Sequence, residues 1–225
     1  MIEDPVIWTA FERIAAAFPD RPYVVTSTGT TTFDEVRQHA ERLAATLHRA
    51  GLGHRVPRSQ LNGWESGQDH LAFYVGNRPA YVEGLLAGFR ARVVPVNINY
   101  RYVANELVEV LSMSRCRGVI FDVEFAETLR TVLPELSCVD VLIQVGGDAP
   151  AVPGAVLYED IIADPSLTTD DMEEPTVDDL CIVCTGGTTG RPKAVLWRQA
   201  DLICTMLGDR HIVSSEQIQT LDDLV

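Results

Sequence analysis

The chain has 225 residues, of which 46% are hydrophobic, and its formal net charge at pH 7 is −14. This length and hydrophobic content predict a globular protein with a buried core, in one large or two small domains. The negative charge argues against a nucleic-acid or anionic-membrane partner, because both would require a basic surface.

The N-terminal residues lack the basic and apolar regions of a signal peptide, and no apolar run approaches the length of about 18 residues expected of a membrane span. Five widely spread cysteines fit reduced thiols, so we expect a cytoplasmic protein. Cys181 and Cys184 form a CxxC pattern, but both lie in a predicted buried strand whose residues three apart face opposite sides. With no metal-ligand spacing among the five histidines either, the sequence predicts no metal site.

The N-terminal residues 6–33 predict a helix and a hairpin. Residues 6–18 have apolar side chains at helical spacing and end at Pro19. Residues 23–26 and 30–33 flank Gly29 and predict a short β-hairpin. Thr32 and Glu35 have the spacing of a capping box for a following helix that ends at Gly51.

Residues 52–69 contain Gly, Pro and Ser without hydrophobic periodicity, which predicts a loop. The next 76 residues alternate between strand and helix patterns. We expect strands over residues 71–75, 93–96, 118–121 and 139–145, with helices over 80–90, 103–112 and up to 129. Strands about 25 residues apart with intervening helices predict an α/β fold whose parallel sheet is covered on both faces. Ligand-binding loops then belong at the carboxyl ends of the strands.

Residues 146–154 read as a surface loop, and an acidic run follows before the next strand. We interpret this run as a solvated linker that points away from any phosphate site. Its members are Asp170, Asp171, Glu173, Glu174, Asp178 and Asp179. Residues 180–184 and 194–197 predict two strands, residues 200–207 a helix, and Thr220 with Asp223 the start of a further helix.

The loop between these two strands is the strongest functional signal. Its glycines permit backbone N–H groups to line one concave face, while threonine hydroxyls and an ammonium add donors suited to a polyphosphate. The candidate ligands are Thr185, Gly186, Gly187, Thr188, Thr189, Gly190 and Lys193. Lys193 is the only lysine among 18 basic residues, which indicates that a compact ammonium is required here. The loop does not have the Walker A spacing, and an ordinary surface loop is the competing interpretation.

The run from Thr185 to Lys193 resembles the signature loop of adenylate-forming enzymes, which include acyl-CoA synthetases, luciferases and peptide-synthetase adenylation domains. Weaker similarities precede it in the same order, at residues 33–36, 77–83, 94–97 and 106–107. Residues 97–102 and 196–201 are most similar to bacterial fatty-acyl-CoA synthetases. Ala194 departs from the family loop, which usually continues with glycine after the lysine. Members of this family usually make the connection over residues 52–69 in a much shorter turn, so the resemblance implies an insertion there.

The resemblance implies ATP-dependent adenylation of a small carboxylic acid, followed by thioester formation with coenzyme A. The candidate ligands would hold the β- and γ-phosphates of ATP, which binds with Mg²⁺. The family's adenine and ribose contacts, its hinge and its C-terminal lid domain with a second catalytic lysine have no counterpart here. No catalytic residue can therefore be assigned, and we expect an N-terminal part that is inactive in full turnover.

We expect an α/β subdomain over residues 1–165, an acidic linker over 166–179, and a truncated phosphate-loop hairpin with its helix over 180–225. Fatty-acyl, steroid side-chain and aryl substrates remain open, as do amino-acid substrates. The alternative function is a phosphate- or nucleotide-binding fragment without catalysis, or a fragment that self-associates as a homodimer through exposed apolar surface.

Overall fold

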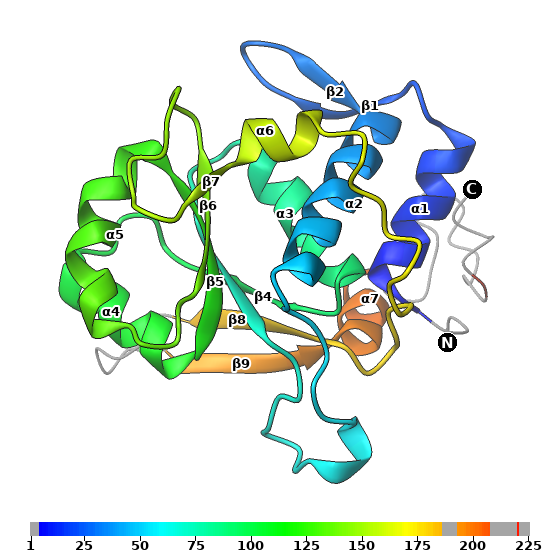
Figure 1. Cartoon of the computed structure of the whole chain (residues 1–225). Coiled ribbons are helices and arrows are strands. Elements are labelled where there is room, and N and C mark those ends of the chain that lie inside the picture. Colours follow the sequence, from blue (N-terminus) through cyan, green and yellow to red (C-terminus); the bar gives the residue numbers. More distant parts are fainter. Residues whose placement is uncertain (1–4, 186–192, 208–219, 221–225) are drawn as a thin grey trace.

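The computed structural model describes residues 5–185, 193–207 and 220. In these residues the main sheet has the strand order β7-β6-β5-β3-β4-β8-β9 (Figure 1). Its strands are β3 His70–Tyr74, β4 Val94–Asn97, β5 Cys116–Asp122, β6 Val141–Val145, β7 Val156–Leu157, β8 Leu180–Thr185 and β9 Lys193–Arg198. Neighbouring strands are parallel except for the antiparallel pair β8 and β9. The predicted α/β class with a mostly parallel sheet is confirmed.

Helices cover both faces of the sheet (Figure 1). Their bounds are α1 Ile7–Ala17, α2 Phe33–Arg49, α3 Pro79–Arg90, α4 Ala104–Met113, α5 Ala126–Val132, α6 Tyr158–Ala163 and α7 Gln199–Leu207. Helices α1, α2, α3 and α6 contribute to one core cluster, whereas α4 and α5 contribute to the other. Single 3₁₀ turns occur at Arg58–Gln60, Val123–Phe125 and Leu133–Glu135. None of the described helices has the length and apolar character needed to span a bilayer.

The predicted hairpin and capping box at the start of α2 are confirmed. Strands β1 Pro22–Val25 and β2 Thr30–Thr32 pair antiparallel. The Glu35 backbone N–H donates to Thr32 Oγ1 at 3.3 Å, and the Thr32 N–H donates to Glu35 Oε2 at 2.8 Å. This reciprocal pair satisfies N–H groups that would otherwise lack helical partners.

Strand β3 is covered on both faces, as its continuous apolar run predicts. All five of its residues are buried. Leu71 and Phe73 pack into the core cluster that contains α2 and α3, whereas Ala72 and Tyr74 pack into the cluster that contains α4 and α5. Alternating side chains of one strand thus supply both cores.

Helix α3 lies unusually close to the sheet at Gly84. A Cβ atom at this position would lie 2.6 Å from the Phe73 ring and 2.8 Å from the Ile120 side chain. Glycine is therefore required by close packing of the helix on β3 and β5, although it lowers the intrinsic stability of the helix.

Strand β7 and helix α6 were not anticipated from the sequence. Both are short, and Val156–Leu157 carries no alternating pattern that distinguishes a strand from the preceding loop. They are held by tertiary contacts: Tyr158 and Ile161 are 6% exposed and pack into the core beside α2.

The interpretation of the acidic run as solvated is wrong for Asp179. Its side chain is 4% exposed and receives hydrogen bonds from Arg92 Nη2 at 3.0 Å and from the Thr176 backbone N–H at 2.8 Å. Glu173 keeps a 76% exposed side chain while it pairs with the same Arg92. Arg92 follows α3 in a left-handed conformation with φ 55°, which directs its side chain to this segment. Glu173 and Asp179 are therefore tied to the turn after α3.

Candidate functional site

The two ends of the predicted phosphate loop lie opposite one another. Strands β8 and β9 form a continuous antiparallel ladder whose last pair is Thr185 and Lys193. The Lys193 side chain is exposed at this end. The other predicted ligands fall outside the described residues: Gly186, Gly187, Thr188, Thr189 and Gly190.

This hairpin end lies at the edge of the sheet where the parallel strands end. Strand β8 runs parallel to β4, with Val96 opposite Ile182, and β4 runs parallel to β3. The carboxyl ends of β3, β4, β5 and β8 therefore share one edge, where ligand loops of α/β sheets gather. Asp179 precedes the other end of the six-residue β8, about 17 Å away at the usual rise of a strand. Asp179 is thus kept from the phosphate-loop edge.

Asp122 fixes the same edge from the end of β5. Its Oδ2 accepts a hydrogen bond from the Gly76 backbone N–H at 2.7 Å, and Arg78 Nε lies 2.7 Å from Oδ1. Burial raises the pKa of the Asp122 carboxyl, against the lowering effect of the Gly76 hydrogen bond and of Arg78. Sequence analysis missed this residue, although an aspartate directly after a buried strand was a usable signal. Asp122 positions the loop that connects β3 to α3.

Aromatic side chains follow the carboxyl ends of β3 and β4. The Tyr74 hydroxyl donates to the Tyr102 carbonyl oxygen at 3.1 Å. Tyr102 and Cys184 of β8 both pack against the core cluster that contains α4, and burial is the main cause that raises the pKa of Tyr102. The Phe125 ring lies 4.8 Å from Tyr74 and 6.0 Å from Tyr100, measured between ring centroids. These rings give the edge a rigid apolar border.

An apolar cavity of about 430 Å³ opens beside the same hairpin. It lies between α1, α3, α7 and the ends of β4 and β8, and its lining includes Tyr81, Leu85, Asn97, Val183 and Ile203. Val183 is two residues before Thr185, so a ligand at the loop could extend an apolar group into this space. The volume is within the range of small-molecule sites.

The two cysteines of the CxxC pattern face opposite sides of β8, as the strand periodicity predicts. Cys181 packs into the core cluster beside α3 and Cys184 into the opposite one. Burial raises the pKa of the Cys181 thiol to about 11, which opposes thiolate formation. Across the described part of the chain, no three His, Cys, Asp or Glu side chains are grouped so as to hold a metal ion.

Comparison with known proteins shows the family. The profile of the AMP-binding enzyme family matches residues 11–223. The medium-chain acyl-CoA ligase Mig of Mycobacterium avium is 41% identical over 220 residues, which are 95% of this chain and 39% of that protein. The 3-oxocholest-4-en-26-oate CoA ligase of Rhodococcus rhodochrous is 30% identical over 89% of this chain and 34% of its own length. The chain thus spans less than two fifths of these relatives.

Solved structures agree on the fold. The long-chain-fatty-acid CoA ligase structure from Rhodopseudomonas palustris superposes with a TM-score of 0.74 at 23% identity, covering 92% of this chain and 48% of that chain. The anthranilate CoA ligase AuaEII gives a TM-score of 0.76 at 18% identity, covering 92% of this chain and 37% of that one. The family match over most of the sequence and the glycine-rich hairpin at the carboxyl edge agree: this chain belongs to the AMP-binding enzyme family.

Proposed function

We propose that the chain is part of an AMP-forming acyl-CoA ligase and that its 185–193 loop holds the phosphates of ATP during adenylation of a carboxylic acid. The pairing of Thr185 with Lys193 at the carboxyl edge carries this proposal. Because the strands fix both ends of the loop, its backbone N–H groups and hydroxyls can converge on one polyphosphate beside the lysine ammonium.

Within this proposal each part of the loop has a role. Gly186, Gly187 and Gly190 permit close backbone approach to phosphate oxygens, and Thr188 and Thr189 offer hydroxyl donors. Lys193 would stabilise the growing charge on the leaving pyrophosphate. Mg²⁺ would arrive with ATP, and coenzyme A would act in the second step, when its thiol displaces AMP. Full turnover would require the part of the relatives that this chain does not span.

The substrate we propose is an apolar carboxylic acid. The cavity of about 430 Å³ beside Val183 supports this choice, because most of the side chains that line it are apolar and Asn97 and Tyr81 are the exceptions. A carboxylate placed at the loop could direct its hydrocarbon part into this space, where burial contributes about 0.8 kcal/mol for each CH₂ group. The names of the two ligases compared above, for medium-chain acyl and 3-oxocholest-4-en-26-oate substrates, agree with this class.

Calorimetric titration with MgATP tests the phosphate site. We expect the chain to bind MgATP, and Lys193→Ala to weaken binding about tenfold or more, because a hydrogen bond to a charged group contributes about 1.5–3 kcal/mol. Arg198→Ala is the matched control, since Arg198 lies at the other end of the same strand and is likewise exposed. It removes an equal charge and should leave the affinity for MgATP unchanged.

If Lys193→Ala and Arg198→Ala lost equal affinity for MgATP, the proposed phosphate site would be contradicted, because the loss would then reflect the overall charge of the protein. Pyrophosphate exchange, measured after the remaining part of a relative is added in trans, then separates a ligase from a binding fragment. Binding without exchange in the reconstituted protein would favour the fragment without catalysis.

We also propose a cytoplasmic location and a homodimer. Cys116, Cys138, Cys181 and Cys184 are free thiols, which fits a reducing compartment. Val195 lies on the edge strand β9 and is 40% exposed, so it offers apolar surface to a second copy. If analytical ultracentrifugation found only monomer at all protein concentrations, the dimer would be excluded. Cell fractionation tests the location, and recovery of the protein outside the cytoplasmic fraction would contradict it.

A further inference from the structure

A second cavity lies on the face of the hairpin β8–β9 that packs with α4, and it reaches from the amino ends of β3 and β5 to Ala194. It has a volume of about 760 Å³ and is bounded by the 52–69 segment, the starts of β3 and β5, and β8 and β9. We call it the insertion groove and define it by Leu61, Trp64, Met113, Arg115, Ile182 and Leu196, which all line it. The activity proposed above makes no use of this groove.

The 52–69 segment that forms one wall is held by specific contacts. Arg58 Nη1 donates to the Glu65 carbonyl oxygen at 2.6 Å, and the Asn62 backbone N–H donates to Glu65 Oε2 at 2.7 Å. At its C-terminal end, Ser66 Oγ lies 2.8 Å from Nε2 of the buried His70. These contacts give the wall a fixed shape before any ligand binds, which lowers the entropic cost of binding.

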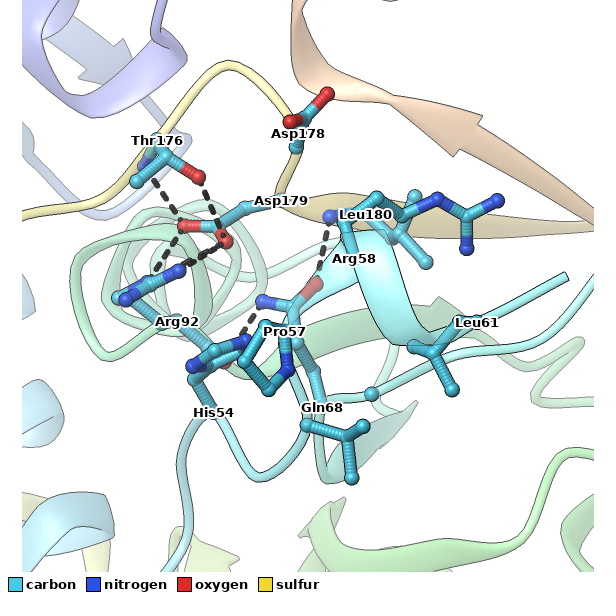
Figure 2. A pocket seen from close by; sticks show the side chains of 12 residues that line it. His54, Pro57, Arg58, Leu61, Gln68, Arg92, Thr176, Asp178, Asp179 and Leu180 are labelled. Atoms are coloured by element: carbon cyan, nitrogen blue, oxygen red, sulfur yellow. Dashed lines mark hydrogen bonds and ion pairs between the residues drawn. The ribbon is translucent and has the colours of Figure 1, made fainter. Parts of the chain in front are cut away.

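The base of the segment is fastened to the sheet by one side chain (Figure 2). Gln68 Nε2 donates to the Arg92 carbonyl oxygen at 2.8 Å, and Gln68 Oε1 accepts from the Leu180 backbone N–H at 2.8 Å. The segment is therefore joined both to the turn after α3 and to the first residue of β8. Gly67 allows the two ends of the segment to pack against each other, since a Cβ atom there would lie only 2.0 Å from the Val56 carbonyl oxygen.

This ordered wall presents a large apolar side chain to solvent. Trp64 is 76% exposed, and Met113 on the opposite side is 40% exposed. Ile182 and Leu196 are cross-strand neighbours on the floor of the groove and belong to the core cluster that contains α4. Because the Trp64 ring stays in water, it adds little hydrophobic stabilisation to the folded chain. An apolar ligand in the groove would cover the ring and gain that free energy on binding.

The groove also contains a cation without a partner. Arg115 is exposed, and its guanidinium makes no hydrogen bond or ion pair with any residue whose placement is described. Its φ of 48° is the left-handed conformation after α4. By contrast, Arg117 is engaged by Asp69 at 3.2 Å and by Asp140 at 2.5 Å. One guanidinium is therefore available to bind an anion.

The charges around the groove favour an anion with a single negative charge. Its lining has two carboxylates and two guanidiniums, from Glu65, Asp69, Arg115 and Arg117, and the carboxylates would repel a phosphate dianion more strongly than a monoanion. A guanidinium fork matches a carboxylate with two parallel hydrogen bonds, and the rest of the groove offers apolar surface.

We propose that the insertion groove binds an amphipathic monocarboxylate, with the carboxylate on Arg115 and the hydrocarbon part across Trp64, Leu61 and the floor formed by Ile182 and Leu196. Most of the groove lies at the amino ends of β3 and β5, and it approaches the phosphate loop only at Ala194. The Ala194 side chain packs with the α4 cluster, whereas the neighbouring Lys193 alternates to the other face of β9. This is therefore a second site on a different face of the hairpin. Binding there depends on neither ATP nor Lys193.

Trp64 fluorescence provides a direct test with decanoate as the probe. We expect a saturable blue shift of emission, because the ligand replaces water around the exposed indole. Trp64→Phe should abolish this shift, since Trp8 is buried and Trp197 is partly buried in the core on the other face of the sheet. Arg115→Asn should weaken decanoate binding about tenfold, and asparagine tolerates the left-handed conformation.

Decanol and a charge control complete the experiment. The neutral decanol should bind equally to the native chain and to Arg115→Asn. Arg130→Asn removes a similarly exposed cation from α5 and should leave the decanoate affinity unchanged. Three results would each overturn the proposal. The emission shift could fail to saturate, it could persist in Trp64→Phe, or the two arginine variants could lose equal affinity for decanoate. Equal affinities of the native chain for decanoate and decanol would also overturn it. Lys193→Ala should retain the shift, which separates this result from the outcome at the phosphate loop.

Discussion

His70 shows how a single titratable side chain makes stability depend on pH. Its ring is 9% exposed, with Nδ1 donating to the Ser114 carbonyl oxygen and Nε2 accepting from Ser66 Oγ. Burial lowers the pKa of His70 below its usual value of 6.5, although the Ser114 hydrogen bond and the nearby Asp69 oppose this shift. Between this lowered pKa and 6.5, His70 is therefore mostly neutral in the folded protein and mostly protonated in the unfolded chain.

We predict that the free energy of unfolding falls as the pH drops below about 6.5. The loss is about 1.4 kcal/mol for each unit by which folding depresses the pKa. In His70→Gln, which keeps a donor for Ser114, this part of the pH dependence should disappear. Urea unfolding at pH 7.5 and 5.5 measures the difference, and identical pH slopes in the two proteins would contradict the assignment.

At the scale of elements, Arg92 joins the turn after α3 to Asp179, the residue that precedes β8. We predict that Arg92→Met lowers the free energy of unfolding by about 3–5 kcal/mol, because it leaves the buried carboxylate of Asp179 without its guanidinium partner. Urea denaturation provides the measurement. The volume of the side chain is nearly kept, so lost packing contributes little.

The neighbouring aspartate supplies the control for this prediction. Asp178 pairs with Arg198 at 3.3 Å, and both side chains are nearly half exposed. Arg198→Met should therefore cost less than about 1 kcal/mol, as is usual for surface ion pairs. If both arginine variants were equally destabilised, burial of Asp179 would not be the cause.

At the scale of the whole molecule, the hairpin β8–β9 and helix α7 are integrated with the preceding elements. Leu180, Cys181 and Ile182 are at most 5% exposed. Gln199 at the start of α7 accepts a hydrogen bond from the Ile7 backbone N–H at 3.0 Å, which joins the first and last described helices. The division into residues 1–165, 166–179 and 180–225 remains a prediction that deletion can test.

We predict that residues 1–207 unfold cooperatively with nearly native stability, whereas residues 1–178 lose cooperative unfolding. The shorter fragment would expose the edge of β4 and the apolar surface that β8 covers. Circular dichroism during urea denaturation compares the two fragments. A cooperative transition of native stability in residues 1–178 would instead support an independent N-terminal subdomain.

The sequence by itself determined the elements with strong local signals. The hairpin, the capping box of α2, the βα alternation and the strand–loop–strand around Thr185 and Lys193 were all predictable, because each depends on residues near one another in the chain. The phosphate-loop assignment depends on residues 186–190, which are outside the described part, and it stays a prediction. The family resemblance came from the same loop and is confirmed by the comparisons.

The tertiary structure alone decided where long-range partners meet. It brought Asp122 to Gly76, Arg92 to the buried Asp179, and the 52–69 segment to β8 and β9. It also formed β7 and α6, whose short sequences have too little periodicity to be recognised. These outcomes depend on burial and on charges separated by many residues, and neither is encoded in local spacing.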